Sequence, residues 1–307
     1  MPKYSKQFYR LTLLLTLSIY AHSVYAQATA PAKQEEGIVP FKKTEVMIPM
    51  RDGAKLHTVI FAPENMAEPL PFLMDRTPYG VDDHKSENLN AAQKELIKDG
   101  YIFVFQDIRG RYKSEGKFVM NRPLRENKND PKAIDETTDT YDTIDWLLKN
   151  VSNNNGRVGV FGISYGGWTT VMALIEPHPA LKAASPQAAM GDTWMGDDFF
   201  HNGAFRLSYG FEYVYELETA KTDTDFKHDR YDTYDWYLRL GALSNVNEKY
   251  FKGKLPTWES FINHPTYDRN WQSKALPRFP YPPLNSRSRP KLLKKMQPVP
   301  RSMKCCA

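Results

Sequence analysis

Short apolar runs alternate with amphipathic stretches over residues 41–190, and this pattern predicts strands separated by helices. The predicted strands are residues 46–50, 56–61, 70–74, 101–105, 158–161 and 181–189. Helices are predicted over residues 89–98 and 136–150. The first two strands form a hairpin around Arg51-Asp52-Gly53. The remaining alternation indicates a mainly parallel sheet joined by right-handed crossovers.

The stretch RVGVFGISYGGWTT, residues 157–170, joins a predicted buried strand to a predicted helix through a Gly-x-Ser-x-Gly turn. Glycines on either side of Ser164 permit strand and helix to approach closely, and the turn lifts the hydroxyl out of the sheet. The helix N-terminus behind the serine stabilises negative charge. An incidental serine in a plain corner is the alternative, but the flanking strand and helix favour a nucleophile.

Residues 191–276 have a different texture. Nearly half of the aromatic residues of the chain fall between residues 194 and 271, among charged residues and with little strand pattern. This composition predicts a mostly helical cap over the edge of the sheet that carries the site, and a second small core domain is the alternative. Ligands of such sheets bind at the carboxyl ends of the strands.

The two ends of the chain differ from its body. Residues 1–26 resemble a secretory signal peptide, with basic residues before an apolar run that is too short to span a bilayer. We therefore expect export to the periplasm or the medium, no stable membrane anchor, and a flexible lead-in over residues 27–40. Both cysteines, Cys305 and Cys306, lie at the far end, so the body must depend on a hydrophobic core.

The formal net charge of +5 comes from the ends of the chain. Residues 285–307 contain seven basic residues and no acidic residue, and the leader adds further positive charge. The body between them is net acidic. The basic balance therefore does not indicate a nucleic-acid partner.

Four segments resemble the peptidase-S15-type α/β-hydrolases, which include cocaine-esterase-like hydrolases, Xaa-Pro dipeptidyl peptidases and α-amino-acid ester hydrolases. In the family's order, they read MRDGAKLHTVIFAP, DRTPYG, QDIRGRYKSEGKF and GISYGG. A fifth, TWMGDDFFHNGAF, looks most like the α-amino-acid ester hydrolases, which cleave or transfer α-amino acyl groups, including those of β-lactam antibiotics. The resemblance implies an α/β-hydrolase fold with a helical cap and no cofactor. It also implies a small amino-acid ester, amide or short peptide as substrate, and leaves a homo-oligomer open.

The resemblance assigns roles to individual residues. Ser164 matches the acyl-accepting nucleophile, while the backbone N–H of Tyr165 and the hydroxyl of Tyr79 match the two donors to the oxyanion. Losing one such donor typically costs ~3 kcal/mol of transition-state stabilisation. Asp198, with Asp197 as the fallback, matches a carboxylate that holds the α-ammonium group of the substrate. The alternatives are a loop aromatic for Tyr79 and a helix N-cap for the aspartates.

Asp107, Arg109 and Arg111 lie in the segment QDIRGRYKSEGKF. The family keeps this loop beneath the site, and we expect arginine–carboxylate pairs there to brace it. We assign these three residues no chemistry.

In the family, an acid and then a histidine follow the cap and complete the triad. Here the resemblance ends near residue 285, and SRSRPKLLKKMQPVPRSMKCCA follows without Asp, Glu or His. We therefore interpret residues 277–307 as an aberrant tail, from a shifted reading frame or a truncated gene. The triad acid, its histidine, the last part of the fold and the family's C-terminal β domain are then missing.

The histidines that follow Ser164 are predicted to be packing or surface residues; they are His178, His201, His228 and His264. The expected function is serine-dependent hydrolysis or acyl transfer on α-amino-acid esters or amides through an acyl-enzyme, with this chain an inactive and poorly folding fragment. A cocaine-esterase-like esterase, a Xaa-Pro dipeptidyl peptidase and a non-catalytic remnant are the alternatives. The expected organisation is a hydrolase domain over residues 41–190 and a cap over residues 191–276.

Overall fold

The computed structural model describes residues 39–87, 89, 93–196 and 198–276. The expectations for the leader, for most of the lead-in, for Asp197 and for the tail lie outside these residues. None of the described helices is long and apolar enough to cross a membrane.

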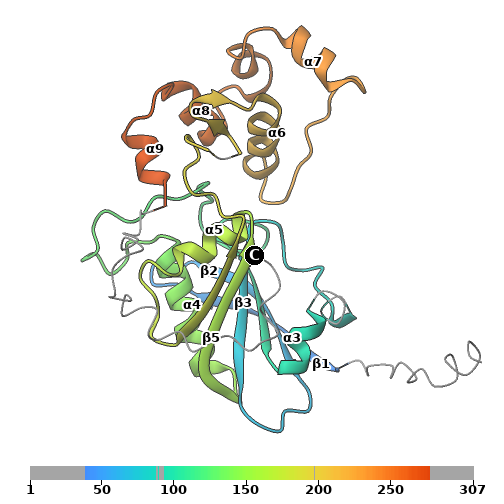
Figure 1. The fold of residues 1–307 in the computed structure, drawn as a ribbon, viewed down its shortest axis with the longest axis vertical. Coiled ribbons are helices and arrows are strands. Elements are labelled where there is room, and N and C mark those ends of the chain that lie inside the picture. The colour runs from blue at the N-terminus through green and yellow to red at the C-terminus, as the bar shows by residue number, and fades with distance from the viewer. Residues whose placement is uncertain (1–38, 88, 90–92, 197, 277–307) are drawn as a thin grey trace, which may run out of the picture. The chain divides into compact units, whose positions relative to one another are not determined.

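Six strands form one mixed sheet in the order β1-β2-β4-β3-β5-β6 (Figure 1). The strands are β1 (Phe41–Pro49), β2 (Lys55–Pro63), β3 (Leu70–Thr77), β4 (Ile102–Asp107), β5 (Asn154–Ile163) and β6 (Leu181–Gln187). The pairs β1–β2 and β2–β4 are antiparallel. The pairs β4–β3, β3–β5 and β5–β6 are parallel. The predicted hairpin and mainly parallel sheet are therefore confirmed.

Apolar side chains cover both faces of this sheet. On one face, Ile144 and Leu147 of α4 (Glu136–Asn150) join a cluster with residues of β3, β4 and β5. On the other face, Ile97 of α3 (Lys94–Asp99) packs with Leu73 and Phe103. Every residue of β4 is buried, as expected for a central strand whose apolar run is continuous.

The strands differ in length from those predicted. β1 begins at Phe41, several residues before the predicted start, because its ladder with β2 continues through polar residues 42–45, which are exposed. The hydrogen bonds that pair two strands use only backbone groups. A strand whose side chains are polar and exposed therefore gives no hydrophobic pattern that would predict it. Helix α4 has the predicted bounds because Asp135 caps it and forms a reciprocal capping box with Thr138.

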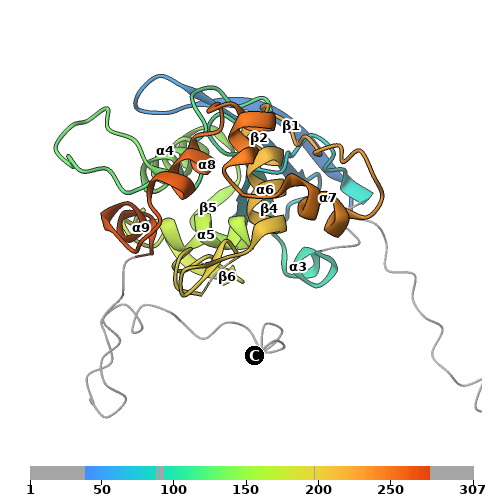
Figure 2. The ribbon, with the colours of Figure 1, turned by 90° about the horizontal axis from the view of Figure 1, so that it is seen from above.

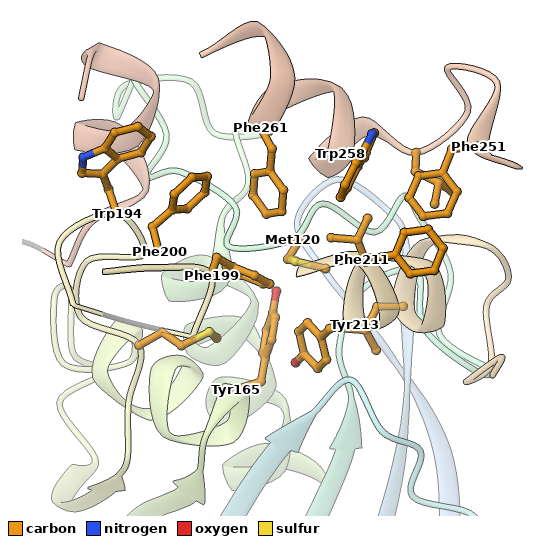
Figure 3. Close-up of a cluster of buried hydrophobic side chains, with 14 of the residues drawn as sticks. Met120, Tyr165, Trp194, Phe199, Phe200, Phe211, Tyr213, Phe251, Trp258 and Phe261 are labelled. Carbon is orange, nitrogen blue, oxygen red and sulfur yellow. The ribbon is translucent and has the colours of Figure 1, made fainter. Parts of the chain in front are cut away.

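The region after the sheet is mostly helical, as predicted, and Figure 2 shows it from above. It contains the short strands β7 (Phe200–His201) and β8 (Ala204–Phe205), then α6 (Leu207–Glu218), α7 (Thr233–Leu240), the π-helical turn η1 (Asn247–Phe251), α8 (Pro256–Asn263) and α9 (Arg269–Lys274). Its aromatic core, which includes Phe211 and Trp258, also takes in Tyr165 and Trp168 of α5 (Tyr165–Met172) (Figure 3). The elbow helix therefore shares one core with this region, which is called the cap below.

Strand β6 is an exposed edge of the sheet in the part of the chain that the structure describes. It pairs with β5, and five of its seven residues are exposed. Unpaired backbone groups on such an edge promote pairing between molecules. We expect Ala183→Lys, which puts a charge on this edge, to slow aggregation at least several-fold, measured by light scattering at constant protein concentration.

The control for this experiment is Ala242→Lys, because Ala242 is exposed in a loop of the cap and the substitution adds the same charge. Equal slowing by both variants would show that net charge, and not the edge of β6, limits aggregation.

Candidate active site

The turn at Ser164 is strained. Strand β5 ends at Ile163 and α5 begins at Tyr165, so a single residue reverses the chain. Ser164 has φ 59° and ψ −117°, a backbone conformation that residues with a Cβ atom adopt only when the surroundings impose it. Its N–H donates to the carbonyl oxygen of Gln187 at 3.0 Å, which fastens the turn to the end of β6.

Glycines make this turn possible by removing side chains from two close backbone contacts. A Cβ atom on Gly162 would lie 2.3 Å from the carbonyl oxygen of Gly166. A Cβ atom on Gly167 would lie 2.2 Å from the carbonyl oxygen of Gln187. No real Cβ contact is this short, so any other residue at either position would push α5 away from the sheet.

Tyr79, in the loop after β3, places its hydroxyl near Ser164. Its hydroxyl lies 2.8 Å from the hydroxyl of Tyr213 in α6 and interacts with the side chain of Ser164. Burial raises the pKa of Tyr79, while the contacts with Tyr213 and Ser164 act in the opposite direction. Tyr79 therefore keeps its proton at neutral pH and can donate a hydrogen bond beside the serine.

Tyr165 divides its polar groups between two tasks. Its buried side chain accepts a hydrogen bond from the N–H of Asn121 at 2.9 Å and packs edge-to-face on Trp168. Its backbone N–H is the first of α5, and the first N–H groups of a helix have no carbonyl partner within the helix. The side chain of Tyr165 thus fixes the start of α5 on Asn121 and Trp168. Its backbone N–H, next to Ser164, is available to an anion.

Arg111 joins the Tyr79 loop to the cap. Its guanidinium is fully buried and donates to the carbonyl oxygen of Pro78 at 3.0 Å. It also donates to the carbonyl oxygens of Leu217 and Ala220, at 2.6 and 2.8 Å, and pairs with Asp223. The end of α6 and the residue before Tyr79 therefore share one cation.

Arg109 completes the bracing of the same segment. It forms bidentate pairs with Asp139 and Asp52, with the closest contact to each at 2.7 Å. The prediction that arginine–carboxylate pairs brace this loop is confirmed.

Asp198 lies before β7 and is not an N-cap, because α6 begins only at Leu207. That alternative is therefore wrong. Its carboxylate accepts from Arg206 at 3.1 Å, and both side chains are about two-fifths exposed. It also interacts with Tyr209, whose pKa is raised first by burial and then by this carboxylate. Tyr209 stacks on Tyr213 at 5.2 Å, so Asp198 is connected to Tyr79 through two tyrosines.

The histidines that follow Ser164 have other partners. His264 pairs with Asp268, and His228 packs on Trp236. His178 accepts from the N–H of Ala180, and the side chain of His201 is exposed. Among the described residues, no hydrogen bond joins Ser164 to a histidine, so the packing and surface interpretation of these residues is confirmed.

Asp75 is an unexpected acid beside the elbow. One of its carboxylate oxygens would lie 3.2 Å from a Cβ atom on Gly166, and the same oxygen has no hydrogen-bond partner among the described residues. Burial raises the pKa of Asp75 to about 7, and the N–H of Arg76 only partly compensates. A carboxyl group that titrates near neutral pH therefore lies beneath the helix that follows Ser164.

No sequence pattern marked Tyr213, Tyr209 or Asp75 as residues of this site. Tyr209 and Tyr213 are four residues apart on α6, a spacing that places two side chains on one face of a helix. Asp75 directly follows the apolar run of β3 and still belongs to the strand, which was a visible signal of an acid at the edge of the core.

Known proteins are similar to this chain over most of its length. The sequence profile of the X-Pro dipeptidyl-peptidase (S15) family matches residues 52–283. The chain belongs to this family. The cocaine esterase of Rhodococcus sp. (strain MB1 Bresler) is 29% identical over 248 residues, which cover 76% of this chain and 40% of the esterase.

Two solved structures are also similar. An α-amino acid ester hydrolase is 41% identical with a TM-score of 0.71, over 81% of this chain and 42% of that one. An aminopeptidase from a marine sediment archaeon, Thaumarchaeota archaeon, is 39% identical with a TM-score of 0.70, over 80% of this chain and 43% of that one. The chain thus spans about two-fifths of the length of these S15-type serine hydrolases, and its α/β-hydrolase fold is theirs.

Asp75 gives the free energy of unfolding a defined pH dependence. Because its folded pKa is raised, the folded state binds the proton more tightly than the unfolded state between pH 4 and 7, and stability falls as pH rises through this window. We expect Asp75→Asn to remove this fall. Above pH 7 the variant should be more stable by a few kcal/mol, at ~1.4 kcal/mol per pKa unit.

Urea unfolding at several pH values measures this difference, with Asp130→Asn as the control because Asp130 is exposed. The interpretation fails if Asp75→Asn and the parent chain keep a constant difference in stability from pH 4 to 8.

Proposed function

We propose that the protein transfers acyl groups of α-amino-acid esters or amides to Ser164 and releases them to water or to another acceptor. The observation that carries this proposal is the strained serine with the Tyr79 hydroxyl beside it. Neither a structural turn nor a packing aromatic requires this arrangement, whereas an acyl-transfer site requires both a presented nucleophile and donors to an oxyanion.

In the first step, the Ser164 Oγ atom attacks the carbonyl carbon of the substrate, and the π electrons move to the carbonyl oxygen. The Tyr79 hydroxyl and the Tyr165 N–H donate to this oxyanion, which also lies at the positive end of α5. When the carbonyl re-forms, the bond to the alcohol or amine breaks, that group leaves with the proton that Ser164 lost, and an acyl-Ser164 ester remains. Water then attacks this ester, the acyl group is released as the carboxylic acid, and one proton of the water restores the serine hydroxyl.

Among the described residues, no histidine is placed to remove the proton of Ser164. A serine needs a base to become an efficient nucleophile, and the described histidines contact other partners. Oxyanion donors and binding alone leave a small residual rate in enzymes that have lost their base. The described residues therefore favour reaction with activated acyl or phosphonyl reagents and slow turnover of ordinary esters.

Asp198 supports the choice of an α-amino substrate. Its carboxylate interacts with Tyr209, whose ring stacks on Tyr213. The hydroxyl of Tyr213 in turn contacts that of Tyr79, so a row of contacts connects Asp198 to Tyr79. Its pair with Arg206 is exposed, and exposed pairs contribute little free energy. A substrate ammonium group can therefore compete with Arg206 for this carboxylate.

A neutral-ester esterase, as the similarity to cocaine esterase suggests, is the second candidate. The α-amino substrate is favoured because the solved structures at about 40% identity are called an α-amino acid ester hydrolase and an aminopeptidase. The two functions differ in whether the amine of the substrate matters.

The nucleophile is tested by covalent labelling with a fluorophosphonate probe. Because the turn presents Ser164 to the oxyanion donors, we expect the parent chain to be labelled and Ser164→Ala to lose at least nine-tenths of the label. Ser185→Ala is the control, since Ser185 lies beside β5 on the neighbouring strand β6. Labelling that Ser164→Ala leaves unchanged would exclude Ser164 as the nucleophile.

Substrate choice is tested by protection of Ser164 from the same probe, which needs no turnover. An α-amino-acid methyl ester should protect the parent chain better than its desamino analogue. Asp198→Asn should weaken protection by the amino ester about ten-fold and leave the desamino ester unchanged, because only the ammonium group uses the carboxylate. Arg206→Gln should strengthen protection by the amino ester, since it removes the competing cation.

Asp225→Asn is the matched control for this experiment, because Asp225 is an exposed aspartate of the same cap. Equal losses for both esters in Asp198→Asn would favour the neutral-ester esterase and give Asp198 a role in shaping the cap.

A further inference from the structure

A buried histidine on β2 faces two carboxylates, one of which lies in the loop that carries Tyr79. His57 is 3% exposed, and its Nδ1 atom lies 2.9 Å from an oxygen of the fully buried Asp107. Its Nε2 atom points at Glu45 of β1, at 3.5 Å, and at Asp82 in the loop after Tyr79, at 3.6 Å. Neither the sheet core nor the serine site explains this arrangement.

The hydrogen bonding of His57 decides what Nε2 can do. A carboxylate accepts hydrogen bonds and does not donate them, so the Asp107 contact keeps the proton of a neutral imidazole on Nδ1. The Nε2 lone pair of that neutral ring then faces oxygen lone pairs of two acids, which is repulsive unless a positive charge lies between them. A carboxylate behind Nδ1 is also the usual way in which proteins orient a metal-binding histidine.

We propose that His57 Nε2, Glu45 and Asp82 bind a divalent transition-metal ion of the zinc class, with Asp107 as the residue that orients His57. Ligand atoms of the three residues lie within 4.8 Å of one another. Bonds of about 2.0–2.2 Å around a tetrahedral ion place neighbouring ligand atoms roughly 3.3–3.6 Å apart. The separations from Nε2 to the two carboxylates already have this length.

The donor set selects the class of ion. One imidazole nitrogen with two carboxylate oxygens suits Zn²⁺ and its neighbours in the transition series, whereas Ca²⁺ and Mg²⁺ prefer oxygen ligands alone. Three protein ligands leave the fourth position to water. The acids are 44% and 40% exposed, so an ion can reach the site from solvent.

Lys113 is the competitor of the metal ion. Its ammonium group lies 2.7 Å from Asp82 and 3.7 Å from Glu45, and its side chain is 52% exposed. Lys43 pairs with the other oxygen of Glu45 at 3.1 Å. Because Lys113 is long and solvated, it can leave the carboxylates at small cost, and the bound ion and Lys113 exclude each other. A lysine–carboxylate network with a protonated His57 is the rival explanation, and it predicts no ion binding.

The site has a consequence for the catalytic loop. Asp82 is three residues after Tyr79, and Lys113 directly follows Tyr112, whose ring a Cβ atom on Gly80 would meet at 2.7 Å. An ion shared by β1, β2 and Asp82 would fasten this loop to the sheet. Metal binding therefore stabilises the segment that carries Tyr79.

The test titrates Zn²⁺ into the whole, tag-free, chelator-treated chain, in which Cys305→Ser and Cys306→Ser remove the terminal thiols. Calorimetry should show one ion per chain, and Co²⁺ should give the intense visible absorption of a four-coordinate site. His57→Asn keeps a donor towards Asp107 but removes Nε2, and should weaken binding at least ten-fold. Asp82→Asn, at a half-exposed position, should do the same. Zn²⁺ should raise the midpoint of thermal unfolding of the parent but not of His57→Asn.

Lys113→Met should tighten Zn²⁺ binding at least ten-fold, because it removes the competing cation. Glu68→Gln is the matched control, since it removes an exposed carboxylate elsewhere, and it should leave the affinity unchanged. The proposal is overturned if His57→Asn and Asp82→Asn bind Zn²⁺ as the parent does. It is equally overturned if neither the parent nor Lys113→Met binds Zn²⁺, because the lysine–carboxylate network then explains the cluster.

Discussion

The structure depends on a close backbone approach between β5, α5 and β6 at Ser164. Gly162 and Gly167 remove the two Cβ atoms that would collide with carbonyl oxygens there, and the Ser164 N–H is fixed on Gln187. This packing holds the serine in a conformation that costs on the order of 1–3 kcal/mol, so the sheet and the elbow helix must supply that free energy. The presentation of the hydroxyl is therefore a property of the whole sheet and not of the five-residue motif.

The second constraint is that hydrogen bonds and an ion pair join the cap to the Tyr79 loop. Arg111 is a fully buried cation whose donors are shared between Pro78 and the end of α6. Removing one partner of a buried charge commonly costs 3–5 kcal/mol, so the loop and helix are expected to keep their relation. The contact between Tyr79 and Tyr213 also joins the cap to this loop. A change in the cap is therefore expected to move the Tyr79 hydroxyl as well.

Sequence periodicity predicted the sheet because buried parallel strands are continuous apolar runs, and it predicted α4 because a cap and an apolar stripe coincide. It failed where structure depends on backbone groups alone, as in the exposed first half of β1. The Ser164 turn was predictable because it is local. The Tyr79–Tyr213 contact joins residues 134 positions apart, so no local pattern contains it. The raised pKa of Asp75 likewise arises from burial beneath α5, which depends on the assembled fold.

The loop that carries Tyr79 is held on both sides by charged groups. Before Tyr79, the carbonyl oxygen of Pro78 accepts from Arg111. After it, Asp82 faces Lys113 and His57. An oxyanion donor contributes fully only within about 2.7–3.1 Å of the developing charge, so small movements of this loop matter more than its distance from the serine suggests. The buried Arg111 contact restricts those movements before Tyr79, whereas the solvated Lys113 pair after it contributes little free energy by itself. In the function that we propose, the charged residues around the loop would therefore set how precisely the Tyr79 hydroxyl is placed beside Ser164.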